Sequence, residues 1–326
     1  MMRVIRWVLP ALVIAAAVAF PLVAGPYPLA VAQSVLIFMA LAVSWDMLLR
    51  SGQISFGIAG FFGIGAYGAA LSALKLTTPA LVSILIAGAC AAAVAAVLGF
   101  VILRLRKVYF AITTLALAEI FQAIIHNWSD FTGGPEGLVL PSLIFGGDAK
   151  SLYWLALAVV LLACALSAAF QHSRLRFALT AIRNNEVSAR SSGIAIFTYL
   201  MVAFVATSFI QGIVGGVQVQ IYGFASPDSV FDANYTLLPL AMALLGGTYS
   251  TPGPILGAVL LGVASEYLKL EIPYGHLVVY GIIIVLVILL LPEGLYGVYR
   301  RLVKASARSA ADARTNRAAH GGTAHA

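Results

Sequence analysis

Residues 80–103 read ALVSILIAGACAAAVAAVLGFVIL, an apolar run that contains no charged side chain. A helix rises 1.5 Å per residue, so about 20 such residues cross the roughly 30 Å hydrocarbon core of a bilayer. The run is typical of the chain, which has 326 residues, of which 62% are hydrophobic and 10% charged. Soluble domains carry about 25% charged residues. The composition therefore excludes a water-soluble protein and predicts a membrane protein.

Similar runs recur along the chain and predict an all-α, polytopic membrane protein with about ten transmembrane spans. The expected spans are 7–24, 28–49, 54–74, 79–103, 108–125, 152–170, 197–222, 232–249, 252–270 and 275–291. Lys and Arg near span ends stay on the cytoplasmic side. With the N-terminus inside, 16 of the 19 basic residues fall inside, and only Lys75, Lys150 and Lys269 fall outside. This asymmetry predicts that both termini are cytoplasmic.

The two ends of the chain differ from the spans between them. Arg3 and Arg6, followed by an apolar stretch and a small-residue triplet at 30–32, imitate a secretory signal. The second span begins almost at once, which favours an uncleaved first span. Residues 305–326 have no apolar period and predict a disordered cytoplasmic tail behind a transmembrane domain at 1–304. The net charge of +7 does not indicate nucleic acid, because most of the basic residues are needed to orient the spans.

Two glycine-rich stretches are poor ordinary helices. Residues 52–68 hold six glycines in 17 positions, and each glycine costs up to about 1 kcal/mol relative to alanine in a helix. Residues 244–258, LLGGTYSTPGPILGA, are interrupted by glycine and proline. Such residues permit close helix packing in lipid, or they break a helix beside a transport path. Both interpretations stay open, and two such segments in the two halves predict an internal repeat with a path between the repeats.

Three carboxylates fall within expected spans: Asp46, Glu119 and Glu266. A charged side chain at the middle of a span costs about 2.5–3.5 kcal/mol on insertion scales, so each needs a reason. Asp46 precedes Arg50 by four residues, and an ion pair on one helix face at the membrane interface explains it. Glu119 and Glu266 lie deeper, where they either pack against polar groups of neighbouring helices or act as proton relays.

The inner loop at 171–193 is the most informative soluble element. Leu175, Ala178, Leu179 and Ile182 recur at helical spacing and predict a short amphipathic helix. Several arginines around them keep the loop cytoplasmic. The helix either lies at anionic headgroups or docks in a groove of a cytoplasmic partner.

The loop resembles the coupling loop of permease subunits in bacterial ABC importers for branched-chain amino acids. The similar stretch is Ala181-Ile182-Arg183-Asn184-Asn185-Glu186, followed by Ala189 and Gly193-Ile194. Other blocks are similar in the same order, and they are SGQISFG at 51–57, FFGIGAY at 61–67, YFAITTLA at 109–116, TGGPEG at 132–137 and PGPILGA at 252–258. The match runs from about residue 28 to 300 and is most similar to the LivM-type permease.

The resemblance implies a bacterial inner-membrane assembly for amino-acid transport. Its partners would be a second, LivH-type permease, two cytoplasmic ATP-binding subunits and a periplasmic substrate-binding protein, with membrane lipid around the permeases. No Gly-Lys dipeptide occurs in the sequence, so the chain lacks a Gly-Lys-Ser/Thr phosphate loop. The chain is therefore expected to bind no cofactor and not to be an enzyme, and ATP and Mg would be bound by the partner subunits.

The same resemblance assigns residues to two roles and leaves the substrate open. Coupling to the ATPase is expected from Ala181, Ile182, Arg183, Asn185, Glu186 and Gly193, while Arg190 and Ser191 depart from the family pattern. Translocation path or helix packing is expected from Gln53, Ser55, Gly57, Gly60, Gly63, Thr113, Thr114, Glu119, Gly253 and Gly257. No catalytic or metal-binding residue is expected. The substrate is expected to be leucine, isoleucine or valine; urea, short amides or other amino acids are the alternative, and a proton-coupled carrier or channel is a further one.

Overall fold

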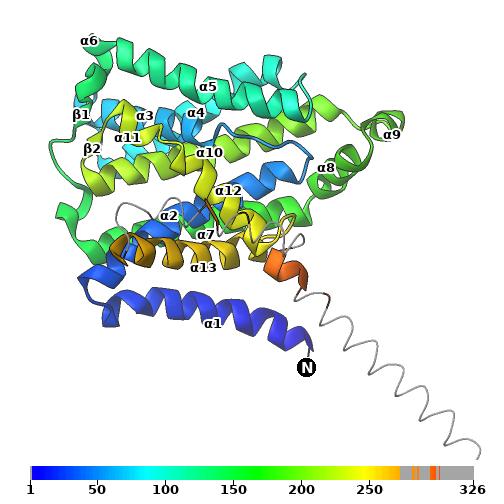
Figure 1. Cartoon of the computed structure of the whole chain (residues 1–326), viewed down its shortest axis with the longest axis horizontal. Coiled ribbons are helices and arrows are strands. Elements are labelled where there is room, and N and C mark those ends of the chain that lie inside the picture. Colours follow the sequence, from blue (N-terminus) through cyan, green and yellow to red (C-terminus); the bar gives the residue numbers. More distant parts are fainter. Residues whose placement is uncertain (1, 272–280, 283–284, 286–293, 299–300, 302–326) are drawn as a thin grey trace, which may run out of the picture.

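The computed structural model describes residues 2–271, 281–282, 285, 294–298 and 301, and most of this part of the chain is helical (Figure 1). The long helices are α1 (Met2–Val23), α2 (Pro26–Leu49), α3 (Ile58–Lys75), α4 (Ala80–Ile102), α5 (Val108–Asn127), α7 (Ala149–His172), α10 (Ile196–Tyr222), α12 (Asn234–Gly246) and α13 (Pro252–Glu271). The shorter elements are α6 (Ser129–Thr132), η1 (Gly134–Glu136), β1 (Leu138–Val139), η2 (Ile144–Gly147), α8 (Arg174–Asn184), α9 (Glu186–Ser191), β2 (Phe224–Ala225) and α11 (Pro227–Val230). β1 and β2 form one short antiparallel pair.

Six of the described helices are long and apolar enough to cross a membrane, namely α2, α3, α4, α5, α7 and α10. Each coincides with one of the spans expected from the sequence, which confirms the all-α, multi-pass fold class. Within the part of α1 and α13 whose side chains the structure describes, the apolar stretches are Leu12–Val23 and Pro252–Leu268. The expected tail at 305–326 lies outside the described residues, and so does the expected span at 275–291 except for 281–282 and 285.

Helix α10 forms the centre of the bundle and packs against α3, α4 and α2. Glycines allow its close approach to α3. A Cβ added to Gly65 would lie 2.3 Å from the carbonyl oxygen of Gly212, and one added to Gly215 would lie 2.0 Å from that of Phe62. On its other side α2 packs against α7, α12 and α13. The glycine-rich stretch at 58–68 is therefore a packed interior helix.

The expected span at 232–249 is not one long helix. α12 has 13 residues, which is about 20 Å at 1.5 Å per residue and less than the hydrocarbon thickness. The chain reaches α12 through β2, α11 and the non-helical residues 231–233. Phe231 is buried and stacks on Tyr67 of α3 with 6.4 Å between ring centroids. The Phe231 ring thus packs this irregular segment against α3, whereas Asp232 and Ala233 are exposed.

Gly65→Ala should lower the thermal midpoint of the purified protein, because the added Cβ would lie 2.3 Å from the carbonyl oxygen of Gly212. We expect a loss of about 1–3 kcal/mol, the usual cost of overpacking. Gly68→Ala is the matched control on the same helix, since its Cβ would meet the Cys90 side chain at an ordinary 3.4 Å. The control should leave the midpoint unchanged or raise it. Equal losses for the two variants would contradict the close packing of α3 on α10.

Candidate functional site

The predicted amphipathic helix in the inner loop is present as α8. Together with α9 it projects beyond the ends of the long helices (Figure 1). Ala178, Leu179 and Ile182 are buried on one face of α8, as their helical spacing requires. Phe177 points away from the bundle and is 75% exposed. The helix pair α8–α9 therefore has an apolar face against the bundle and an apolar side chain left open.

Helix α9 has a cap at each end. The Asn185 side chain accepts a hydrogen bond from the Ser188 N–H at 3.1 Å and begins the helix. Gly193, with φ at +77°, ends it. The Gly193 N–H donates to Arg190 O and the Ile194 N–H to Ala189 O, a Schellman arrangement. Asn185 and Gly193 of the resemblance thus have structural roles as helix caps.

The turn between α4 and α5 is joined to α9 by an ion pair. Arg106 Nε donates to Glu186 Oε2 at 2.7 Å, and a second guanidinium nitrogen donates to Oε1 at 2.9 Å. Arg106 also donates to the carbonyl oxygens of Leu103 and Leu105. The hydrogen bonds that Arg106 donates to the Glu186 carboxylate lower the pKa of Glu186 below its ordinary value. The carboxylate is therefore ionised at neutral pH and holds α9 to this turn.

Arg183 of α8 lies between the two glycine-rich segments. A Cβ on Gly52, whose φ is +83°, would lie 3.1 Å from Arg183 Cγ and 3.3 Å from Arg183 Cα. Glycine here permits both the turn after α2 and the close approach of α8. On the other side, the Arg183 guanidinium lies 4.0 Å from the centroid of the Tyr249 ring, a cation–π contact. One side chain thus connects α8 to the start of the α2–α3 turn and to the α12–α13 turn.

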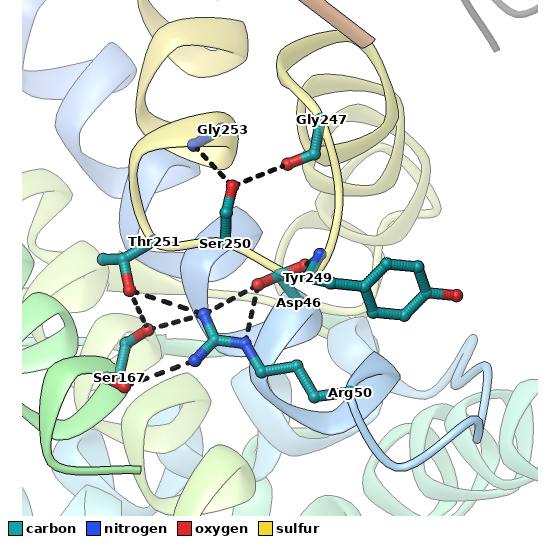
Figure 2. Close-up of polar contacts among 8 residues, drawn as sticks. All are labelled: Asp46, Arg50, Ser167, Gly247, Tyr249, Ser250, Thr251 and Gly253. Atoms are coloured by element: carbon teal, nitrogen blue, oxygen red, sulfur yellow. Dashed lines mark hydrogen bonds and ion pairs between the residues drawn. The ribbon is translucent and has the colours of Figure 1, made fainter. Parts of the chain in front are cut away.

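Beneath Tyr249 lies a buried ion pair (Figure 2). Arg50 Nη2 is 2.8 Å from Asp46 Oδ2, and it also donates to Ser167 Oγ of α7 at 2.8 Å and to Thr251 Oγ1 at 3.4 Å. The other Asp46 oxygen accepts the Tyr249 N–H. The pair predicted from the sequence is present, and Asp46 is fully buried within the protein. The Asp46–Arg50 pair joins α2, α7 and the turn before α13.

The polar residues expected at a path mostly make contacts between α3 and its neighbours. Ser55 is buried and its Oγ accepts the Gly57 N–H at 3.2 Å. Thr114 Oγ1 of α5 accepts the Phe56 N–H at 3.0 Å. Gln53 is buried, and its Nε2 donates to Leu105 O at 3.3 Å. Within the described residues its Oε1 has no hydrogen-bond partner.

The expected glycines each face a nearby atom across a helix contact. Gly57 faces Thr114, Gly60 faces Ala118, Gly63 faces Phe231, Gly253 faces Gly247 and Gly257 faces Met242. Thr113 is half-buried and Glu119 is exposed. These contacts bring Ser55, Gly57 and Thr114 together near the start of α3, while Gln53 contacts Leu105 in the α4–α5 turn. A role in the path stays a prediction.

Helix α5 has an open face that the sequence did not predict. Phe110, Thr114 and Ala118 are buried on the opposite face, and α5 packs chiefly against α3. The open face exposes Tyr109, Ile112, Leu115, Ile120 and Ile124 around Glu119. A carboxylate is costly against lipid and is usually found where a helix meets protein or water. The face is thus suited to a partner subunit or an aqueous path rather than to lipid alone.

Comparison with known proteins gives the family. Residues 27–288 match the family described as "Branched-chain amino acid transport system / permease component". The chain belongs to this permease family. It is 30% identical over 317 residues to the high-affinity branched-chain amino acid transport system permease protein LivM of Escherichia coli strain K12, a match that covers 88% of this chain and 74% of that protein. The resemblance to LivM-type permeases is confirmed.

The chain is also similar to two further proteins. The permease protein LivH of Salmonella typhimurium strain LT2 is 28% identical over 191 residues, which cover 53% of this chain and 60% of LivH. A solved structure, PsaBC from Streptococcus pneumoniae in complex with a Fab, aligns with 84% of this chain and 92% of that chain at a TM-score of 0.44 and 17% identity.

In this permease, Glu186→Gln should loosen α9 from the α4–α5 turn. A partly buried charge-assisted pair is worth about 1 kcal/mol, so backbone amides of α9 should exchange hydrogen about fivefold faster by mass spectrometry in nanodiscs. Arg190→Gln is the control, because Arg190 is 3.8 Å from Glu186 and its side chain is 76% exposed. Exchange unchanged in Glu186→Gln, or equally fast in the control, would contradict this attachment.

The attachment of α9 should also depend on pH in one direction. Because the pKa of Glu186 is lowered in the folded protein, the stabilisation is fully present above the ordinary carboxyl range and is lost as pH falls through the lowered pKa. After correction for intrinsic rates, wild-type and Glu186→Gln proteins should differ in α9 exchange at pH 7 and converge in acid. A difference that grows in acid would contradict an ionised Glu186.

Proposed function

We propose that this chain is a membrane-spanning permease subunit of an ABC importer for the branched-chain amino acids leucine, isoleucine and valine. The observation that carries the proposal is the family match over residues 27–288. The helix pair α8–α9, which is attached to the bundle and exposes apolar side chains, supports it. The proposal includes ten spans, both termini in the cytoplasm and a location in the bacterial inner membrane. Urea, short amides and other amino acids are the alternative substrates.

In the proposed assembly, two ATP-binding subunits hydrolyse ATP with Mg, a periplasmic binding protein delivers the substrate, and a LivH-type permease completes the path. Movement of the ATP-binding subunits would displace α8–α9. Their attachments at Arg183 and Glu186 would pass this displacement to the turns between the long helices. The path would open and close by rocking of the two permeases, a rigid-body mechanism.

The open face of α5 is proposed as the contact with the second permease. Its apolar side chains would be buried there, and Glu119 would face the path between the two subunits. This arrangement supports a two-permease assembly, because α5 packs chiefly on α3 among the described residues and exposes the apolar side chains of its open face.

The docking of α8–α9 can be tested through its two most exposed apolar side chains. Phe177 and Val187 are each 75% exposed, and anchors of this kind fill pockets of a partner. Phe177→Ser and Val187→Ser together should lower co-purification of the ATP-binding subunits by at least tenfold, the equivalent of about 1.4 kcal/mol. Leu76→Ser is the control, because Leu76 follows α3 and is 67% exposed. Unchanged recovery in the double variant would exclude α8–α9 as the docking element.

Transport itself requires reconstitution. Radiolabelled leucine should enter vesicles only when both permeases, the ATP-binding subunits, the binding protein and ATP are present. Omission of each component in turn is the control. Uptake by this chain alone would favour a carrier or channel, and uptake of urea with no uptake of leucine, isoleucine or valine would overturn the substrate assignment while keeping the importer.

A further inference from the structure

Tyr249, in the turn between α12 and α13, has an unusual backbone conformation. Its φ is +61°, in the left-handed region that L residues avoid because the Cβ approaches the following carbonyl oxygen. A bulky aromatic residue is rare there, and glycine would adopt the same turn without strain. Such conformations persist where the surrounding contacts hold the residue in place, and they cluster at functional sites.

The strained conformation places two groups of Tyr249 at once. Its N–H donates to Asp46 in the buried ion pair, and its ring receives the Arg183 guanidinium of α8 at 4.0 Å from the centroid. The side chain is 48% exposed, so burial of the ring in the core does not explain its presence. Figure 2 shows the ring pointing away from the hydrogen bonds among Asp46, Arg50 and Ser167.

The turn that carries Tyr249 is otherwise firmly held. Ser250 Oγ donates to Gly247 O at 3.3 Å and accepts the Gly253 N–H at 3.2 Å. Thr251 Oγ1 and Ser167 Oγ are 2.7 Å apart, which joins the turn to α7. A force applied to the Tyr249 ring would therefore reach α7, α13 and, through Asp46, α2.

We infer that Tyr249 is a positioning residue that connects α8 to the buried Asp46–Arg50 pair and so transmits movement of α8 to the membrane-spanning helices. The inference rests on the proposed function. It goes beyond the family match, because it assigns the transmission to a residue in the α12–α13 turn rather than to α8–α9 alone. It also explains why an aromatic residue occupies a position where glycine would relieve strain.

The test is Tyr249→Gly in the reconstituted complex of both permeases, the ATP-binding subunits and the binding protein. Glycine keeps the backbone conformation and the N–H to Asp46 but removes the ring. Leucine transported per ATP hydrolysed should fall by about two- to fivefold, the size of a partly exposed cation–π contact. Tyr249→Phe keeps the ring and should retain the wild-type ratio. The thermal midpoint of Tyr249→Gly should be equal to or above that of the wild type.

Phe145→Gly is the matched control. Phe145 is also aromatic, has φ at +55° and is 51% exposed, but it lies in η2, before α7, whereas α8 follows the other end of that helix. It should show the same relief of strain and no change in transport per ATP. Tyr249→Gly should also have no further effect when Arg183 is already replaced by alanine, because residues acting through one contact are not additive.

An unchanged ratio in Tyr249→Gly, a loss in Tyr249→Phe equal to that in Tyr249→Gly, or additive effects with Arg183→Ala would each overturn the inference. So would an equal loss in Phe145→Gly. These outcomes differ from failure of the proposed function, in which the wild-type complex itself does not import leucine, isoleucine or valine in response to ATP.

Discussion

The constraint on which this structure depends is that a charged group inside a membrane protein must be satisfied by the protein itself. Asp46 and Arg50 meet it together. Their pair uses one carboxylate, one guanidinium, the Ser167 hydroxyl and carbonyl, the Thr251 hydroxyl and the Tyr249 N–H. Removal of one partner from such a buried pair usually costs about 3–5 kcal/mol, since it leaves the other charge unpaired. Three elements are therefore held at one point: α2, α7 and the turn before α13.

Close packing by glycine is the second constraint, and it operates between α12 and α13, next to the buried ion pair. α12 and α13 meet where a Cβ on Gly253 would lie 1.8 Å from the carbonyl oxygen of Gly247, and one on Gly257 would lie equally close to that of Met242. Without this approach the turn carrying Tyr249 and Thr251 would not reach α2. In lipid, small residues that let backbones approach drive helix association, so the helical propensity lost at each glycine is offset by packing.

The long helices could be predicted from the sequence because the bilayer imposes their length. Six expected spans coincide with helices of suitable length, and the amphipathic spacing at Leu175, Ala178, Leu179 and Ile182 correctly predicted α8. α12 was predicted too long, because the expected span 232–249 includes residues 232–233 and 247–249, which lie beside apolar residues such as Phe231 but are not helical. Hydropathy measures what can be buried in lipid, and it does not distinguish burial against lipid from burial against α3.

The contacts of the candidate site were predictable only where they are local. Asp46 and Arg50 are four residues apart and could be paired on one helix face. Glu186 and Arg106 are 80 residues apart, and Arg183 and Tyr249 are separated by α9, α10, α11 and α12, so neither pair has a spacing signal. The open face of α5 was missed for a related reason. A single sequence shows which positions are apolar, but whether lipid or a second subunit covers them depends on the packing of the remaining helices.

The two attachments of α8–α9 differ in a way that bears on movement. The Glu186–Arg106 pair has side chains about one-third exposed, and water can replace each partner, so this contact can break and re-form at low cost. The second attachment, Arg183 on the Tyr249 ring, is backed by the Asp46–Arg50 pair, which is enclosed, so water cannot replace the partners of that pair without opening the core. If α8–α9 moves, the Glu186–Arg106 ion pair, which joins α9 to the α4–α5 turn, is the contact expected to break and re-form. The contact of Arg183 with Tyr249 would be kept during the movement, so a displacement of α8 would reach Tyr249 and, through its N–H, the buried ion pair.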